Sequence, residues 1–341
     1  MSTAADFTTA ADSRLESLRQ WLRQAVAEPV LDLQPVSVDA SFRRHFRAQL
    51  PGRTVIVMDA PPDKEDCRQF IKVAGLLHAA RLHAPEILAQ DLAQGFLLLS
   101  DLGTRTYLDV LNNENAASLF RDAVDALILW QLASRPEILP SYDEALLRRE
   151  LDLFPEWYVG RHLKLTLTSR QQQILTAAFT SIIRQNLSQP RVFVHRDYMP
   201  RNLMVSDPNP GIIDFQDAVY GPVTYDVISL FKDAFISWEE EQVLDWVIRY
   251  WEKARKAGLP VPADFGEYYR DLEWMGLQRH LKVLGIFARI HHRDGKPRYL
   301  SDTPRFVNYV RHAAARYSAL TPLLRLLDEL EKQTALNHQT T

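Results

Sequence analysis

Residues 192–202 read VFVHRDYMPRN, and residues 212–214 read IID. Each apolar run predicts a short buried strand, the first leading into a polar loop and the second ending in a carboxylate. The loop has His-x-Asp-x-x-x-x-Asn spacing from His195 to Asn202, and Asp214 closes the second strand. Phosphoryl transfer uses one carboxylate to accept a hydroxyl proton and further oxygen atoms to hold magnesium on the nucleotide phosphates. The pattern therefore predicts a small-molecule kinase.

Three side chains of this segment are the candidates for the chemistry. Asp197 would accept or orient the proton of the attacking hydroxyl, and Asn202 and Asp214 offer oxygen ligands that suit magnesium. Taken singly, each residue also fits a structural role in a turn. We expect the catalytic role for Asp197 and the metal-binding role for the other two, because all three follow predicted strands.

Two neighbouring residues are expected to support the loop, and a third is expected to have no direct role. A histidine at the end of a buried strand is more often a hydrogen-bonded structural residue than a proton carrier, so we expect His195 to hold the loop. Asp226 precedes an apolar helix, where free N–H groups favour a carboxylate, and we expect it to brace the catalytic loop. Asp217 could contact a second metal, although a solvated turn carboxylate is the simpler interpretation.

The composition is that of an ordinary globular chain. Its 341 residues are 46% hydrophobic and 24% charged, enough for two lobes with cores of their own. The net charge of −3 gives no electrostatic footprint for nucleic acid, and the single cysteine excludes an internal disulfide. Because residues 1–12 are small and polar, we expect no signal peptide, and no apolar run approaches the ~18 residues that a membrane span needs. We expect a cytoplasmic monomer with no membrane partner.

The periodicity predicts an α+β fold with two lobes. The first lobe should hold a helix over residues 13–27 and a five-stranded, mostly antiparallel sheet with one helix over about residues 29–100. Pro51-Gly52 should join a hairpin of strands 42–50 and 53–60. The remainder is expected to be mainly helical, over residues 115–134, 142–160, 170–186, 225–235, 238–257, 264–290 and 304–332. The expected domains are residues 1–100, a hinge at 101–103, and residues 104–335.

At the catalytic loop the chain resembles the aminoglycoside phosphotransferase family, which has a bilobal, protein-kinase-like fold with a small antiparallel-sheet lobe and a larger helical lobe. The resemblance implies that Asp197 is the base, that Asn202 and Asp214 bind magnesium, and that ATP is the phosphoryl donor. Residues 97–103, LLLSDLG, resemble the hinge between the lobes. This implies that backbone groups of Ser100 and Leu102 meet the adenine.

Three further stretches resemble the kinases of this family that phosphorylate the anomeric hydroxyl of amino sugars in bacterial cell-wall recycling, with N-acetylmuramate and N-acetylglucosamine as acceptors. They are ASFRRHFR at residues 40–47, VIVMDAPP at residues 55–62 and RDGKP at residues 293–297.

The chain departs from the family in the small lobe. Kinases of this fold usually place a lysine on the third strand to bind phosphates, yet residues 54–60 contain none, and the preceding turn lacks a glycine-rich run. Arginine can hold a phosphate with two hydrogen bonds, so we expect the turn residues Ser41, Arg43 and Arg44 to meet the nucleotide. We hypothesise that Arg44 contacts the phosphates. The alternative is that these arginines form the outward face of an edge strand.

A basic cluster marks the expected acceptor wall. It contains one acidic residue, Asp294, and the cations Arg289, His291, His292, Arg293, Lys296 and Arg298. Such a cluster suits a neutral or anionic acceptor, for example a sugar with a carboxylate, and we expect Arg289 and His291 to contact it. The alternative is a solvated helix C-terminus, where cations are favoured. Trp157 could stack on a sugar ring, although aromatic residues at such spacing are more often core.

Three interpretations of the function therefore compete. The first is an ATP- and magnesium-dependent kinase of amino sugars. The second is another kinase of the same family, acting on an aminoglycoside, a choline-like alcohol or an alcohol derived from an amino acid. The third is a catalytically weak nucleotide-binding regulator, which the missing lysine suggests. The presence of Asp197, Asn202 and Asp214 argues against the third interpretation, because binding alone needs no base and no pair of metal ligands.

Overall fold

The computed structural model describes residues 4–36 and 42–339, without the side chains of residues 4–12 and 338–339. The chain forms two compact units. The smaller is Met1–Arg105 with Met204–Asp217, and the larger is Thr106–Leu203 with Ala218–Thr341. Unlike the expected continuous division at residues 101–103, the smaller unit therefore takes a second segment from the middle of the chain.

Backbone hydrogen bonds tie that second segment to the smaller unit. The Ile212 N–H donates to the carbonyl of His83 at 2.7 Å, and the Val205 N–H donates to the carbonyl of Arg105 at 2.9 Å. These pairings link residues a hundred or more positions apart, so local periodicity could not predict them.

The smaller unit is built on a five-stranded sheet of order β1-β2-β3-β5-β4, in which every neighbouring pair is antiparallel. The strands are β1 (Asp32–Val36), β2 (Arg44–Leu50), β3 (Arg53–Asp59), β4 (Ile87–Asp91) and β5 (Phe96–Ser100). The expected hairpin is confirmed, with Leu50 opposite Arg53 and Gly52 at a φ of 79°. This left-handed conformation is why the turn carries a glycine.

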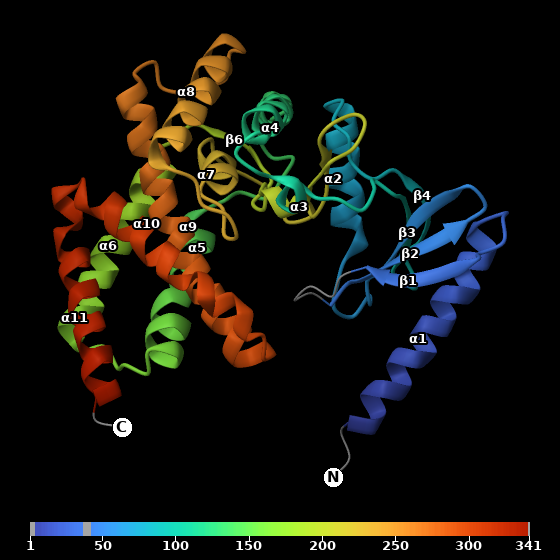
Figure 1. The fold of residues 1–341 in the computed structure, drawn as a ribbon, viewed down its shortest axis with the longest axis horizontal. Helices are drawn as coiled ribbons and strands as arrows, with labels where there is room; N and C mark the ends of the chain where they lie inside the picture. Colours follow the sequence, from blue (N-terminus) through green and yellow to red (C-terminus); the bar gives the residue numbers. More distant parts are fainter. Residues whose placement is uncertain (1–3, 37–41, 340–341) are drawn as a thin grey trace. The chain divides into compact units, whose positions relative to one another are not determined.

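Helix α1 (Ala4–Ala25, blue in Figure 1) covers one face of this sheet. Its Leu18 and Leu22 share a core with Phe46, Ala48, Leu50, Val55, Val57, Phe96 and Leu98. The even-numbered side chains of β2 and the odd-numbered ones of β3 therefore face α1. The second helix, α2 (Cys67–Ala79), buries Phe70, Val73, Ala74 and Leu77, the residues that the sequence places on one face.

The larger unit is mainly helical. Its α-helices are α3 (Tyr107–Val110), α4 (Ala116–Leu132), α5 (Glu144–Leu151), α6 (Ser169–Leu187), α7 (Tyr225–Phe231), α8 (Glu240–Lys256), α9 (Phe265–Asp294), α10 (Thr303–Ala315) and α11 (Thr321–Gln339). Shorter helical segments are η1 (Phe154–His162), η2 (Pro200–Asn202), η3 (Pro297–Asp302) and η4 (Ser318–Leu320). A short antiparallel sheet pairs β6 (Arg191–Val194) with β9 (Val219–Pro222). A second two-stranded sheet pairs β7 (Leu203–Met204) with β8 (Gly211–Ile212), and its residues from Met204 onward belong to the smaller unit.

Two of the expected helices are interrupted. The helix expected over residues 142–160 divides into α5 and the π-helix η1, and Pro155 stands in the first turn of η1. The helix expected over residues 304–332 divides into α10 and α11, and Pro322 stands in the first turn of α11. Proline lacks the N–H that continues an α-helix but fits a first turn, so each proline begins a new helix.

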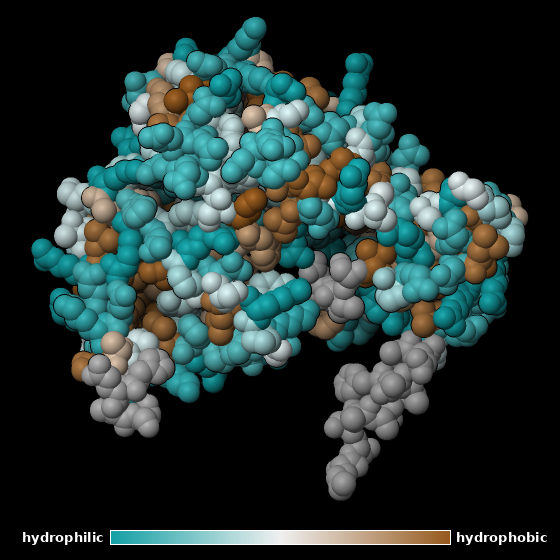
Figure 2. Space-filling view, in the orientation of Figure 1, coloured by the Kyte–Doolittle hydropathy of each residue, from teal (hydrophilic) through white to brown (hydrophobic). Residues whose placement is uncertain are grey.

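The 30-residue helix α9 forms the buried centre of the larger unit (Figure 1). Its Gly285 lies so close to the segment before η1 that an added Cβ would stand 2.4 Å from the carbonyl carbon of Leu153. Within the described residues, no helix has both the length and the hydropathy to cross a membrane. Hydrophilic residues cover most of the face seen in Figure 2, with hydrophobic residues in smaller areas.

Candidate active site

The loop after β6 is held by the buried carboxylate of Asp226. The main-chain N–H of His195 donates to Asp226 Oδ2 at 2.7 Å, and that of Arg196 donates to Oδ1 at 3.0 Å. Burial raises the pKa of Asp226 to about 7, although these two hydrogen bonds act in the opposite direction. Asp226 lies in the first turn of α7. Its two hydrogen bonds fix the backbone immediately before Asp197.

The larger unit brings Asp197 and Asn202 together. Asn202 is buried in η2, and its Nδ2 donates to the main-chain carbonyl of Asp197 at 2.9 Å. The Asp197 N–H donates to His195 Nδ1 at 3.3 Å, and the histidine itself is buried. This contact makes Nδ1 an acceptor and assigns the proton to Nε2. His195 thus holds the loop through its ring as well as through its backbone.

A buried network around Glu150 fixes the other side of the loop, and the sequence reasoning missed it. Glu150 Oε1 lies 2.6 Å from Arg196 Nη2 and 2.9 Å from Lys282 Nζ. Its Oε2 accepts hydrogen bonds from Gln278 Nε2 at 2.9 Å and from the hydroxyl of Tyr142. Burial opposes ionisation of Glu150, but Lys282 and Arg196 lower its pKa to about 2.

The network joins Glu150 of α5 to Tyr142 just before that helix, to the catalytic loop and to α9. The only signal in the sequence is a charged residue at a position of α5 that helical spacing assigns to the apolar face. That signal indicates that Glu150 is a charged residue in a buried position, but it does not identify the residues that pair with it.

In the smaller unit, Asp214 follows β8 in a left-handed conformation, with a φ of 62°. This region is uncommon for a residue other than glycine and is concentrated at functional loops. Asp214 is exposed, and its Oδ1 accepts a hydrogen bond from Gln216 Nε2 at 3.0 Å. The next residue, Phe215, is buried against Phe70 of α2, with ring centroids 4.7 Å apart. Asp217 is exposed as well.

The donor atoms of Asn202 and Asp214 fit magnesium. An amide oxygen and a carboxylate are hard ligands, and magnesium usually completes its shell with water and phosphate oxygens. In the described part of the chain, no three His, Cys, Asp or Glu side chains are grouped closely enough to hold a metal ion.

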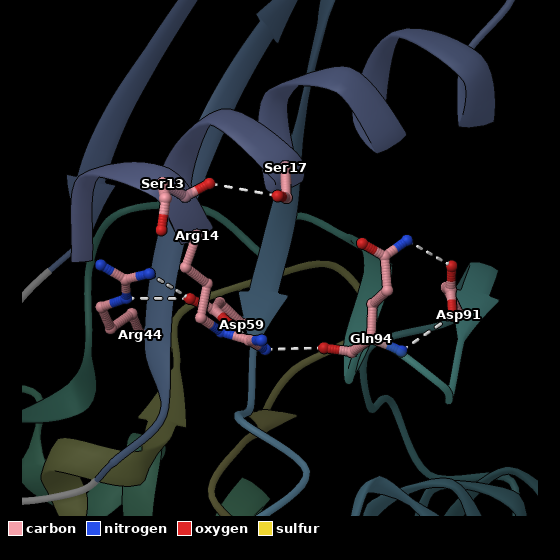
Figure 3. Close-up of polar contacts among 7 residues, drawn as sticks. All are labelled: Ser13, Arg14, Ser17, Arg44, Asp59, Asp91 and Gln94. Atoms are coloured by element: carbon pink, nitrogen blue, oxygen red, sulfur yellow. Dashed lines mark hydrogen bonds and ion pairs between the residues drawn. The ribbon is translucent and has the colours of Figure 1, made fainter. Parts of the chain in front are cut away.

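Arg44 is engaged in an ion pair on the sheet face that α1 covers (Figure 3). Its Nε donates to Oδ2 of the fully buried Asp59 at 2.9 Å, and Arg14 Nε of α1 donates to Oδ1 at 2.7 Å. Arg14 Nη2 also donates to the Gln94 carbonyl at 2.6 Å. Ser41, expected in the same nucleotide-binding turn, lies outside the described residues.

Arg43 precedes Arg44 by one residue and is half-buried. Its charge acts on the thiol of Cys67 at the start of α2, so the two side chains lie near one another. Because successive side chains in extended backbone point to opposite faces, Arg43 belongs to the face opposite α1.

The hinge candidates are held by side chains of the smaller unit. Asp101 accepts hydrogen bonds from Arg47 Nε at 2.6 Å and from the Gly103 N–H at 3.0 Å. Burial opposes ionisation, yet these hydrogen bonds and one from a threonine keep the pKa of Asp101 below its ordinary value. Ser100 exchanges hydrogen bonds with Glu86, since the Ser100 N–H donates to the Glu86 carbonyl and Ser100 Oγ accepts from the Glu86 N–H.

Leu102 is half-buried, and its Cδ1 would stand 2.9 Å from a Cβ added at Gly211. The contacts of Ser100 and Leu102 with adenine stay a prediction.

The candidate acceptor residues lie on η1 and on the last turns of α9. Trp157 is half-buried on η1, with the Arg161 guanidinium 6.0 Å from its ring centroid. Arg289 and His291 are half-buried on α9. Their roles in acceptor binding stay predictions.

Comparison with known proteins identifies the family. Residues 32–265 match the phosphotransferase enzyme family. The chain is 55% identical to the N-acetylmuramate/N-acetylglucosamine kinase of Pseudomonas aeruginosa, with 94% of this chain and 97% of that protein covered. It is 48% identical to the protein of the same name from Neisseria meningitidis, with 92% of this chain and 95% of that protein covered.

Solved structures share the fold at low sequence identity. The choline kinase LicA from Streptococcus pneumoniae has a TM-score of 0.64 at 14% identity, covering 89% of this chain and 99% of its own. The ADP-bound aminoglycoside phosphotransferase APH(2'')-Ib has a TM-score of 0.59 at 13% identity, covering 86% of this chain and 97% of its own. The expected α+β, protein-kinase-like fold is confirmed. The chain belongs to the phosphotransferase enzyme family.

Proposed function

We propose that this chain is an ATP- and magnesium-dependent kinase that phosphorylates the anomeric hydroxyl of N-acetylmuramate and N-acetylglucosamine. The observation that carries the proposal is its 55% identity, over nearly the whole of both proteins, to a curated kinase named for these two sugars. The position of Asp197 in a loop fixed from two sides supports the same reaction.

Asp197 is the proposed base. It would take the proton of the anomeric hydroxyl as that oxygen attacks the γ-phosphorus of ATP, and the bond to the leaving ADP oxygen would break. Asp226 holds the backbone before Asp197, and Glu150 holds the side chain of Arg196 beside it. A base that is already oriented needs little reorganisation during the reaction, which is how positioning lowers a barrier.

We propose Asn202 and Asp214 as the residues that hold magnesium. When bound with the nucleotide, the ion would offset negative charge on the phosphates. For the phosphates themselves we propose Arg43 ahead of Arg44, because the alternation of side chains puts Arg43 on the sheet face opposite α1, whereas Arg44 lies with Asp59 on the face that α1 covers. Backbone groups of Ser100 and Leu102 are the proposed adenine contacts.

The test is ATP turnover by the purified protein with a panel of acceptors: N-acetylmuramate, N-acetylglucosamine, an aminoglycoside and choline. We expect ADP release with the two amino sugars and none after magnesium is removed with EDTA. Turnover only with the aminoglycoside or with choline would favour another kinase of the family. ATP binding without turnover on any acceptor would favour a nucleotide-binding regulator. We also propose a cytoplasmic monomer, which light scattering can test for oligomeric state.

A further inference from the structure

We propose that the last turns of α9 and the end of η1 form an anion-binding patch that recognises the carboxylate of N-acetylmuramate. This inference rests on the proposed function and extends it, because it names the group that separates one acceptor from the other. The patch, called here the α9–η1 patch, consists of Arg161, His162, Lys164, Arg289, His291 and His292.

Ring contacts bring the two segments of the patch together. The ring centroids of His291 and His292 lie 4.5 Å apart, and those of His162 and His292 lie 5.9 Å apart. The close approach of Gly285 to Leu153 fixes the spacing of the two segments two turns earlier on α9. Residues from η1 and α9 thus form one surface, although more than a hundred residues separate them in the sequence.

The cations of the patch form no direct ion pair among the described residues, although the charges of Asp294 and Glu156 act on Arg289 from further away. In the ranges that the structure describes, Arg161, Lys164 and Arg289 form no ion pair, whereas the neighbouring Arg293 pairs with Asp294 at 2.6 Å. Arg289 Nε and His291 Nδ1 are also buried without a hydrogen-bond partner. A buried polar group without a hydrogen bond raises the free energy of the folded protein until a ligand or water bonds to it. An anion that accepts hydrogen bonds would therefore bind favourably at the patch.

The pKa directions agree with mutual repulsion within the patch. Burial, followed by the charges of His292 and His291, lowers the pKa of His162. Burial, followed by the charge of Arg293 just outside the patch, lowers the pKa of Arg289, while Asp294 and Glu156 act in the opposite direction. A bound carboxylate would relieve this repulsion, and arginine can hold a carboxylate through two parallel hydrogen bonds.

The chemistry of the two sugars matches this arrangement. Both carry the same ring, N-acetyl group and anomeric hydroxyl, but only N-acetylmuramate has a lactyl ether that ends in a carboxylate. Lys282 joins α9 to the network behind the catalytic loop, and Arg289 is seven residues further along, roughly 10 Å on a helix. A sugar ring with its lactyl group and an extended arginine side chain can span that length.

The experiment compares kcat/KM for the two sugars in the wild type, Arg289→Ala, Arg289→Lys and Arg270→Ala. We expect Arg289→Ala to lower kcat/KM for N-acetylmuramate roughly 10- to 100-fold, the usual effect of losing a hydrogen bond to a charged group, with a much smaller change for N-acetylglucosamine. Arg289→Lys should restore part of the loss. Arg270→Ala, at an exposed arginine near the start of the same helix, is the matched control and should leave the ratio of the two sugars unchanged.

If the ratio of kcat/KM for the two sugars were unchanged in Arg289→Ala, the proposal would be overturned. This includes an equal loss on both sugars, because an equal loss indicates a general effect on folding or catalysis. Calorimetric titration of the wild type and Arg289→Ala with each sugar checks the same selectivity without turnover. If the wild type turned over neither sugar, the proposed function would fail. Equal or absent binding of the two sugars in the titration would then overturn the patch separately.

Discussion

Asp197 is the residue on which the catalytic proposal depends. Replacement by asparagine keeps the size and the loop contacts but removes the proton acceptor, so we expect kcat to fall roughly 10²- to 10⁴-fold with little change in KM. Steady-state kinetics with either amino sugar measures this. Asp207→Asn, at an exposed carboxylate of a neighbouring loop, is the control. Near-normal turnover in Asp197→Asn would exclude a role as base.

Glu150 is the residue that we expect to matter most for the stability of the larger unit. Glu150→Gln leaves the buried Lys282 and the half-buried Arg196 without their counter-charge, and breaking a buried pair costs roughly 3–5 kcal/mol. Urea unfolding at pH 7 measures the loss, with Glu144→Gln on the exposed face of α5 as the control. A loss no greater than that of the control would contradict the role assigned to the network.

The same variant has a predicted pH dependence. The folded-state pKa of Glu150 is lowered to about 2 from 4.5, so its charged form stabilises the fold above the unfolded-state pKa. That contribution is lost as the pH falls from about 4.5 towards 2. The difference in unfolding free energy between the wild type and Glu150→Gln should therefore shrink over this acidic range. A difference that stays constant down to pH 2 would contradict the assigned pKa.

Substitution of Arg43 and of Arg44 tests which of the two arginines binds the nucleotide phosphates. If Arg43 meets the phosphates, Arg43→Ala should raise the KM for ATP at least several-fold, by the loss of a charge-assisted contact. Arg44→Ala should instead lower stability, because it leaves the buried Asp59 with one partner, Arg14. A raised KM for ATP in Arg44→Ala alone, with unfolding unchanged, would restore the original hypothesis for Arg44.

The roles of single residues could be predicted from the sequence where those residues lie within one short segment. Asp197, Asn202 and Asp214 fall within eighteen residues, so their spacing alone indicates a reaction. Glu150 and Lys282 act through partners on distant helices, and no local spacing links them. The pairing of Arg44 with Asp59 depends on which residues of β2 and β3 face α1, and this follows only from the strand register.

At the scale of elements, the packing of α9 against the segment before η1 makes a specific prediction. Gly285→Ala would place a Cβ 2.4 Å from the backbone of Leu153, so we expect a loss of about 1–3 kcal/mol in unfolding free energy from overpacking. Gly75→Ala is the matched control, because no atom lies within 4 Å of the added Cβ on α2. It should stabilise by up to ~1 kcal/mol through helix propensity.

Urea unfolding of the two glycine variants gives both values. A Gly285→Ala protein as stable as Gly75→Ala would mean that α9 and η1 are packed more loosely than the structure indicates, and it would weaken the geometry of the α9–η1 patch.

The order of elements was predictable where helical or alternating periodicity runs unbroken. The β2–β3 hairpin and α2 follow from such patterns, whereas β1, with the sequence DLQPV, shows no alternation that predicts a strand. The division into α5 and η1 was not predicted, since Leu151, Phe154 and Val159 continue an apolar pattern through Pro155. Strand β9 was also missed. It has four residues, two of them glycine and proline, and it becomes a strand only by pairing with β6.

At the scale of the whole molecule, fold and function rest on different comparisons. Solved kinases at 13–14% identity share the fold, which shows that packed layers tolerate almost complete replacement of the sequence. Function is more specific, and the curated relatives at 48–55% identity carry the name of one activity. The net charge of −3 is small, so selection of an anionic acceptor must come from local groups such as the α9–η1 patch.

The product of the reaction tests the central claim most directly. The purified protein would be incubated with ATP, magnesium and N-acetylglucosamine, and the product examined by proton and phosphorus NMR. Phosphorylation of the anomeric hydroxyl predicts that the signal of the proton on C1 gains a coupling to phosphorus and that interconversion of the two anomers stops. Phosphate on another hydroxyl, with C1 still free to interconvert, or no phosphorylated sugar at all, would contradict the account.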